Sequence, residues 1–200
     1  MMRLVLGMLA AIAIASPCAA AAPAIGQPAP AFAAVDSNGR SRSLAEFKGK
    51  TVVLEWTNNG CPYTRKHYDS GNMQRLQQEA TASGAAWLSV ISSAPGKQGY
   101  VTGAEANALT QSRGAHPTAV LLDPSSTMAR AYEAQTTPHM FVIDKTGVLR
   151  YMGAIDDRPT AAPASLVGAR NYVREALAAL ASGRPVAIAS TEPYGCSVKY

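Results

Sequence analysis

The sequence has few cysteines, few aromatic residues and few charges. Its 200 residues include three cysteines, 6% aromatic and 16% charged side chains. Three cysteines cannot supply the disulfide framework of a small secreted scaffold, so stability must come from an ordinary apolar core. The 18 basic residues never form a block of five or more, which leaves no footprint for nucleic-acid binding. The length suits about one domain.

The first 22 residues have the composition of a cleavable signal peptide. Met1-Met2-Arg3 is a short positive segment, and the apolar run from Leu4 to Ala15 is shorter than a membrane-spanning helix. Small residues follow, with cleavage expected after Ala21. A lipoprotein signal on Cys18 is the alternative, which the preceding proline disfavours. We therefore expect a periplasmic or secreted protein with no later segment that spans a membrane.

After this leader, segments typical of strands alternate with segments typical of helices. The expected strands are Thr51–Trp56, Trp87–Ile91, Thr118–Leu122, Met140–Ile143 and Val148–Met152. The expected helices run from Pro62 to Gly84, Ala104 to Ser112, Ser126 to Tyr132 and Asn171 to Ala181. Such alternation predicts a sheet with parallel crossovers and helices on both faces, and the hairpin at the last two strands makes that sheet mixed.

The chain divides into three parts on this reading. Residues 1–22 are the signal peptide, and residues 25–183 form one α/β domain. Residues 184–200 form a C-terminal tail that carries Cys196 and has too few periodic apolar residues to predict a helix or strand.

Cys61 follows a predicted strand and precedes a predicted helix, with Pro62 at a first-turn position where proline is tolerated. Exposed N–H groups and the helix dipole favour an anion there, which predicts a lowered thiol pKa and a nucleophilic sulfur. Thr64 and Arg65 project on the same side of the helix; Arg65 adds positive charge, and Lys66 is expected to raise the local potential further. The alternative is a small buried hydrophobic residue.

Thr64 stands where a Cys-x-x-Cys pair would have its second thiol. Its hydroxyl can only hydrogen-bond the sulfur of Cys61, so the site has one thiol unless another cysteine approaches. Cys196 could approach as a resolving thiol on a flexible tail, form a permanent or intermolecular disulfide, or remain an idle thiol. Glu55, in an otherwise apolar strand, is either a buried acid that moves a proton for Cys61 or an edge-facing residue.

Two further patterns leave alternatives open. Thr137-Pro138 directly precedes a strand, and its peptide bond is either cis or an ordinary trans bond at a strand start. His116-Pro117 competes for the same role. A copper site built from Cys61, His139 and Cys196 is the metal alternative; otherwise we expect no metal and no cofactor.

Together these segments resemble the thioredoxin fold, and more closely the AhpC/TSA-type redoxins of an exported bacterial branch called peroxiredoxin-like. The matching stretches are residues 26–32, 44–50, 54–58, 61–63, 136–144, 151–157 and 193–200. The resemblance implies a thioredoxin-like α/β fold, in which a mixed central β-sheet is flanked by helices on both faces. An N-terminal extension and a C-terminal tail would be added to that fold.

The resemblance also implies roles for individual residues. Cys61 takes the place of thioredoxin's nucleophilic cysteine, and Pro138 that of the cis-proline facing it. The backbone of Thr137 would hold a bound peptide or thiol, with Pro62 and Tyr63 as further substrate-binding candidates. Peroxiredoxins place their peroxide-reactive cysteine where this chain has a threonine, three residues after Cys61.

The sequence therefore predicts an exported thiol–disulfide oxidoreductase. Cys61 attacks a disulfide or an oxidised thiol, and Cys196 or an external thiol resolves the mixed disulfide. The partners would be protein or small-molecule thiols and disulfides. Two alternatives remain: a thiol peroxidase that acts on peroxides through a Cys61 sulfenic acid, and a copper chaperone or redox-inert binding module.

Overall fold

The structure is a computed structural model that describes residues 22–200, so the predicted leader, with its lipoprotein alternative at Cys18, lies outside the described residues except for Ala22. Within the described range, the strands form one seven-stranded sheet and a separate two-stranded pair. In spatial order, the large sheet contains β2 (Ser41–Ser43), β1 (Ala33–Asp36), β5 (Ala119–Leu122), β4 (Ala86–Ile91), β3 (Val52–Trp56), β7 (His139–Ile143) and β8 (Leu149–Gly153).

The sheet is mixed, as the sequence predicts. Strands β3, β4 and β5 are parallel, because the segments that connect them cross over through helices. Strand β7 runs antiparallel to β3, and the β7–β8 hairpin extends the sheet on that side. Strand β1 runs antiparallel to β5 on the other side.

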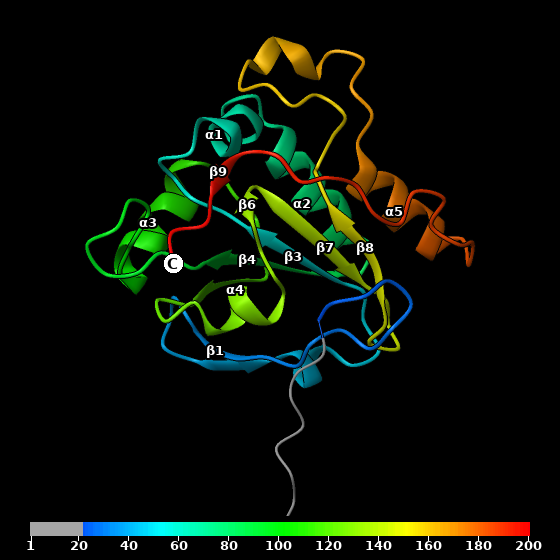
Figure 1. Ribbon diagram of the computed structural model, residues 1–200, viewed down its shortest axis with the longest axis horizontal. Helices are drawn as coiled ribbons and strands as arrows, with labels where there is room; N and C mark the ends of the chain where they lie inside the picture. The colour runs from blue at the N-terminus through cyan, green and yellow to red at the C-terminus, as the bar shows by residue number, and fades with distance from the viewer. Residues whose placement is uncertain (1–21) are drawn as a thin grey trace, which may run out of the picture.

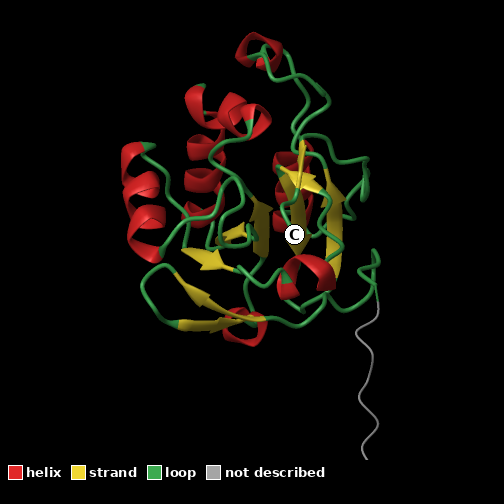
Figure 2. Ribbon diagram, turned by 60° about the vertical axis from the view of Figure 1, so that its left-hand side comes forward, coloured by secondary structure: helices red, strands yellow, loops and turns green. Residues whose placement is uncertain are grey.

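Helices cover both faces of this sheet (Figures 1 and 2). They are α1 (Pro62–Asp69), α2 (Asn72–Ala82), α3 (Gly103–Ser112), α4 (Thr127–Ala131) and α5 (Tyr172–Ala181), with short 3-10 turns at η1 (Leu44–Phe47) and η2 (Pro163–Leu166). The prediction of one helix from Pro62 to Gly84 is wrong, because the chain breaks between α1 and α2. Gly71 adopts a φ of +71° there, a left-handed conformation that glycine takes at little steric cost.

The apolar core has two layers because successive side chains of a strand point to opposite faces. Along β3, Leu54 and Trp56 enter the layer that α4 and the tail cover, where Trp56 packs against Tyr132 and Phe141. Val53 enters the layer under α2 and α5. All residues of β3 are buried between the two layers, so β3 gives the loop that follows it a fixed starting point.

The tail returns across the molecule instead of leaving it. Residues near Ser190 pair with Met152 along the outer strand β8. Further on, β9 (Cys196–Ser197) pairs antiparallel with β6 (Thr136–Thr137), beside α1 (Figure 1). Sequence periodicity gives no sign of β9. None of the helices between residues 22 and 200 is both long and apolar enough to cross a bilayer.

The β7–β8 hairpin depends on Asp144, whose carboxylate accepts hydrogen bonds from Thr146, the amide of Val148 and Arg150. Burial raises the pKa of Asp144, and the hydrogen bonds outweigh burial and hold the pKa at about 2. A lowered folded-state pKa stabilises the fold above the unfolded pKa of about 3.9, and that contribution is lost as the pH falls toward 2.

We therefore predict that Asp144→Ala lowers the free energy of unfolding by about 2 kcal/mol at pH 7. Urea unfolding at pH 7 and pH 3 measures the effect, and the difference from wild type should be smaller at pH 3. Asp69→Ala is the matched control, because Asp69 is exposed and lies 3.6 Å from Arg65 in a surface pair worth little. Equal losses in the two variants at pH 7 would contradict the prediction.

Candidate redox site

Cys61 is the N-cap residue of α1, the first helix after β3. Its amide donates to the carbonyl of Asn58, which closes a tight turn between strand and helix. Pro62 occupies the first helical position, and its side chain is exposed. The sulfur therefore sits at the positive end of the helix dipole, as predicted from the sequence. The Cys61 side chain itself is fully buried (0% exposed).

The register of β3 and β7 brings Pro138 to the same place. Trp56, the last residue of β3, pairs with His139, so Pro138 lies beside the loop that leads to Cys61. The Thr137–Pro138 peptide bond is cis, as the resemblance implies. The thiol of Cys61 donates to the carbonyl oxygen of Thr137 at 3.0 Å.

Cys196 reaches this point from the tail, because it pairs with Thr137 in the β6–β9 ladder. Gly195 makes the approach feasible. Its φ is +141°, and a Cβ at this position would lie 2.1 Å from the carbonyl oxygen of Thr137. Cys61 and Cys196 are both free thiols in the described chain. The tail thus covers Cys61 and brings the second thiol to it.

The surroundings of Cys61 favour its thiolate. Burial raises the pKa of Cys61, but hydrogen bonds to the sulfur outweigh that effect and lower the pKa. The donors are the thiol of Cys196, the side chain of Thr137 and the backbone amides of Thr64 and Cys196. Two of these four donors come from one tail residue. For Cys196, burial and the adjacent Cys61 raise the pKa to about 11, so Cys61 is the first of the two thiols to ionise.

Thr64 and Arg65 act differently from the sequence prediction. Thr64 is buried and contributes its amide to the sulfur, whereas its hydroxyl has no hydrogen-bond partner within the described residues. The Arg65 side chain is 62% exposed and lies 3.6 Å from Asp69, so it pairs along the helix instead of with the sulfur. Positive charge near Cys61 therefore comes from the helix end and not from Arg65.

The sequence does not predict two contacts of α1, one made by Tyr63 and the other by Lys66. The ring of Tyr63 packs edge-on against Tyr194 of the tail, with centroids 5.8 Å apart. Lys66, on the same helix, is buried and pairs with Asp156. We expected Lys66 to raise the potential at Cys61, but Asp156 neutralises it. No local signal reveals this pair, because its members are 90 residues apart.

Glu55 is a fully buried, partnered acid and not an edge-facing residue. Its carboxylate accepts hydrogen bonds from Tyr68, Gln77, Trp87 and Ser89. Burial nevertheless dominates and raises the pKa of Glu55 above its usual value. The described hydrogen bonds of Glu55 do not include Cys61, so a direct proton transfer between the two is not part of this arrangement.

The metal alternative has little in the described residues to build on. His139 is buried, and its Nδ1 accepts from the amide of Gln135. Burial lowers the pKa of His139 to about 4. Among residues 22–200, no three His, Cys, Asp or Glu side chains lie together as a metal-holding group.

A mixed sheet with helices on both faces, a cysteine at the first helix and a cis-proline opposite it define a protein of thioredoxin-like fold. The model of the AhpC/TSA family matches residues 25–152, and the chain belongs to that family. A search of curated proteins finds no match.

Solved structures agree with this fold. The chain is similar to an uncharacterized conserved protein from Geobacillus kaustophilus, with a TM-score of 0.73, 25% identity, and coverage of 88% of this chain and 92% of that one. A hypothetical protein from Sinorhizobium meliloti gives a TM-score of 0.72 and 25% identity, with coverage of 88% and 94%. The thioredoxin domain of a thiol-disulfide oxidoreductase from Bacteroides vulgatus gives 0.52 and 20%, with coverage of 72% and 96%.

Gly195 yields a prediction about access to the sulfur. Gly195→Ala forces a methyl group onto the Thr137 carbonyl, so β9 should leave β6 and expose Cys61. We expect alkylation of Cys61 by iodoacetamide at pH 10, above the usual thiol pKa of about 8.5, to be about tenfold faster than in wild type.

Gly183→Ala is the control for this substitution. Gly183 also has a positive φ of +67° but nothing within 4 Å of an added Cβ, so it tests backbone strain without the clash. Equal alkylation rates in Gly195→Ala and wild type would show that the tail does not limit access to Cys61.

Glu55 yields a prediction about pH. A raised folded-state pKa means that the folded protein holds the proton more tightly, so stability falls as the pH rises from about 4.5 toward the folded-state pKa. Glu55→Gln mimics the protonated acid and should remove that pH dependence. Urea unfolding at pH 5 and pH 8 checks it: wild type should lose stability relative to Glu55→Gln at pH 8, and a constant difference would contradict the assignment.

Proposed function

We propose that this chain is an exported thiol–disulfide oxidoreductase in which Cys61 is the nucleophile and Cys196 the resolving thiol. The observation that carries the proposal is the pairing of Cys196 with Thr137, the residue whose carbonyl oxygen accepts a hydrogen bond from the Cys61 thiol at the start of α1. One thiol is favoured as the thiolate and its neighbour as the proton-bearing thiol, which are the two states that disulfide exchange needs.

The reaction starts with the Cys61 thiolate attacking one sulfur of a substrate disulfide. A bond forms between Cys61 and that sulfur, and the other substrate sulfur leaves as a thiolate. Cys61 then no longer carries negative charge, so its contribution to the raised pKa of Cys196 disappears and only the contribution of burial remains. Cys196 passes its proton to the substrate thiolate that has left and attacks the Cys61 sulfur, and the second substrate sulfur leaves as a thiolate that takes a proton from water. The substrate disulfide is reduced to two thiols, and the protein dithiol is oxidised to a Cys61–Cys196 disulfide.

An external dithiol reductant would return the protein to its reduced form, and the same steps in reverse would oxidise a substrate dithiol. Thr137 and Pro138 are proposed to hold the substrate once the tail moves aside. The similar domain from Bacteroides vulgatus belongs to a protein named a thiol-disulfide oxidoreductase, which agrees with this chemistry. Export rests on the leader composition at residues 1–22.

Membership of the AhpC/TSA family favours a second candidate, a thiol peroxidase. Here the Cys61 thiolate attacks the terminal oxygen of a hydroperoxide, forms a sulfenic acid and releases an alcohol. Cys196 then condenses with the sulfenic acid, which forms the disulfide and releases water. Both reactions end in the same disulfide, so they must be separated by their first step.

The disulfide-exchange and peroxidase reactions can be separated by their oxidants. Oxidised glutathione or tert-butyl hydroperoxide is added to the reduced protein from which only the predicted leader has been removed. Mass spectrometry should find the Cys61–Cys196 disulfide in wild type, a glutathione adduct on Cys61 in Cys196→Ser, and no reaction in Cys61→Ser. Exchange predicts faster oxidation by glutathione disulfide than by the hydroperoxide at equal concentration.

The reverse order of rates, with a dimedone-trapped sulfenic acid in Cys196→Ser, would establish the peroxidase instead. Reaction of Cys61→Ser at the wild-type rate would refute both assignments, because each needs the Cys61 sulfur. The matched threonine variant, Thr64→Val, should react normally in either case, because Thr64 contributes its backbone amide and not its hydroxyl.

A further inference from the structure

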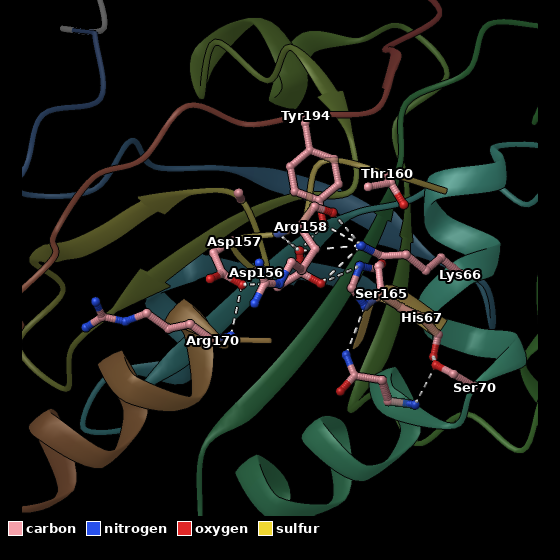
Figure 3. A network of polar contacts seen from close by, with 12 residues as sticks. Lys66, His67, Ser70, Asp156, Asp157, Arg158, Thr160, Ser165, Arg170 and Tyr194 are labelled. Atoms are coloured by element: carbon pink, nitrogen blue, oxygen red, sulfur yellow. Dashed lines mark hydrogen bonds and ion pairs between the residues drawn. The ribbon is translucent and has the colours of Figure 1, made fainter. Parts of the chain in front are cut away.

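The buried ammonium of Lys66 is fully hydrogen-bonded by three different groups (Figure 3). It donates to Oδ1 of Asp156 at 3.4 Å, to the carbonyl oxygen of Arg158 at 2.7 Å and to the phenol oxygen of Tyr194 at 2.9 Å. The side chains of Lys66 and Asp156 are 0% and 1% exposed. An ammonium has three N–H donors, so each acceptor uses one of them.

Tyr194 is the member of this cluster that the tail supplies. Its phenol accepts from Lys66 and donates to Asp156. Its ring packs edge-on against Tyr63 and lies 5.0 Å from the Lys66 ammonium in a cation–π contact. Without the phenol, a buried N–H of Lys66 would lose its acceptor, which is costly in a site closed to water. The hydroxyl of Tyr194 therefore completes the hydrogen bonding of the Lys66–Asp156 pair.

The cluster joins the two elements that carry the thiols. Lys66 and Tyr63 belong to α1, the helix that begins directly after Cys61. Tyr194 is two residues before Cys196, with the close contact of Gly195 to Thr137 between them. Other tail contacts, such as the Val198 amide on the Gln135 carbonyl, hold the tail to the β6 segment and not to α1. Tyr194 thus fixes the tail relative to the helix of Cys61.

We propose that Tyr194, held by the buried Lys66–Asp156 pair, is a positioning residue that keeps Cys196 against Cys61. It raises the effective concentration of one thiol at the other, because the ordering of the tail is already complete before the thiols react. The link to disulfide formation rests on the proposed function. The placement of Cys196 beside Thr137 and Cys61 does not rest on it, because it comes from the β6–β9 pairing.

Tyr194→Phe tests this, since it removes the phenol oxygen and keeps the ring against Tyr63. The loss of a hydrogen bond to a charged group should lower the equilibrium constant for the Cys61–Cys196 disulfide against glutathione by about tenfold. The pKa of Cys61, followed by thiolate absorbance, should rise by about half a unit to one unit. Because burial holds the pKa of His67 at about 4, this neighbour of Asp156 stays neutral throughout the titration.

Two controls separate positioning from general stability. Tyr172→Phe removes a phenol that makes no hydrogen bond within residues 22–200 and should leave both readouts unchanged. In a Cys196→Ala background, which removes the thiol and keeps the backbone amide of residue 196, Tyr194→Phe should shift the pKa of Cys61 by less than it does in wild type, because Tyr194 then positions one donor instead of two.

Each outcome decides one point. Unchanged readouts in Tyr194→Phe would overturn the inference, and so would an equal pKa shift with and without Cys196, since Tyr194 would then act on Cys61 by another route. If wild type forms no disulfide but Tyr194→Phe shifts the pKa of Cys61 more with Cys196 than with alanine at that position, the positioning role stands and the proposed resolving role fails.

Discussion

The pairing of β6 with β9 brings a second thiol to the sulfur at the start of α1, and the properties of the site depend on it. The tail residue Cys196 provides both an amide and a thiol to Cys61, while Thr137 provides its carbonyl and its side chain. A ladder of two residues is weak by itself. Its persistence therefore depends on the ties on either side of it, at Tyr194 and at Val198.

Charged and acidic side chains are buried around the site, and the C-terminal tail covers the sulfur of Cys61. The Lys66–Asp156 pair and the Glu55 carboxylate are both buried, and such groups are tolerated only where hydrogen bonds replace the water they lose. The Cys61 side chain is closed off as well, but by a tail that meets the sheet through a ladder of only two residues. Segments of this kind belong to the low-stability end of a fold, so they can open without unfolding β3 or α1.

Local patterns in the sequence were sufficient to predict the fold and the first half of the site. A β-branched run before Cys61-Pro62 predicts the strand-to-helix junction at Cys61, and the proline before His139 marks the start of the facing strand. Both signals are local in the sequence. The second half depends on contacts between distant residues. Asp156 meets Lys66 across 90 residues, and Cys196 pairs with Thr137 across 59. Neither contact leaves a periodic trace, and a two-residue strand is too short to produce one.

The break at Gly71 shows a different limit. Apolar spacing continues from α1 into α2, so periodicity predicts one helix, whereas a single left-handed residue divides it. The role of Arg65 was predicted from its angular position on that helix, and its exposed side chain instead pairs with Asp69. A helical projection gives the side on which a residue lies, but it does not say whether solvent or a neighbouring residue is the better partner.

The tail also affects how the molecule meets its own copies. Residues near Ser190 hydrogen-bond with Met152 along β8, the outermost strand on that side of the sheet. An uncovered outer strand presents free N–H and C=O groups and is a template for self-association. If the tail detached as far as Ser190, β8 would become an uncovered edge strand able to pair with another copy, and Cys61 would become accessible. Solubility and redox chemistry are therefore linked through the same stretch of backbone.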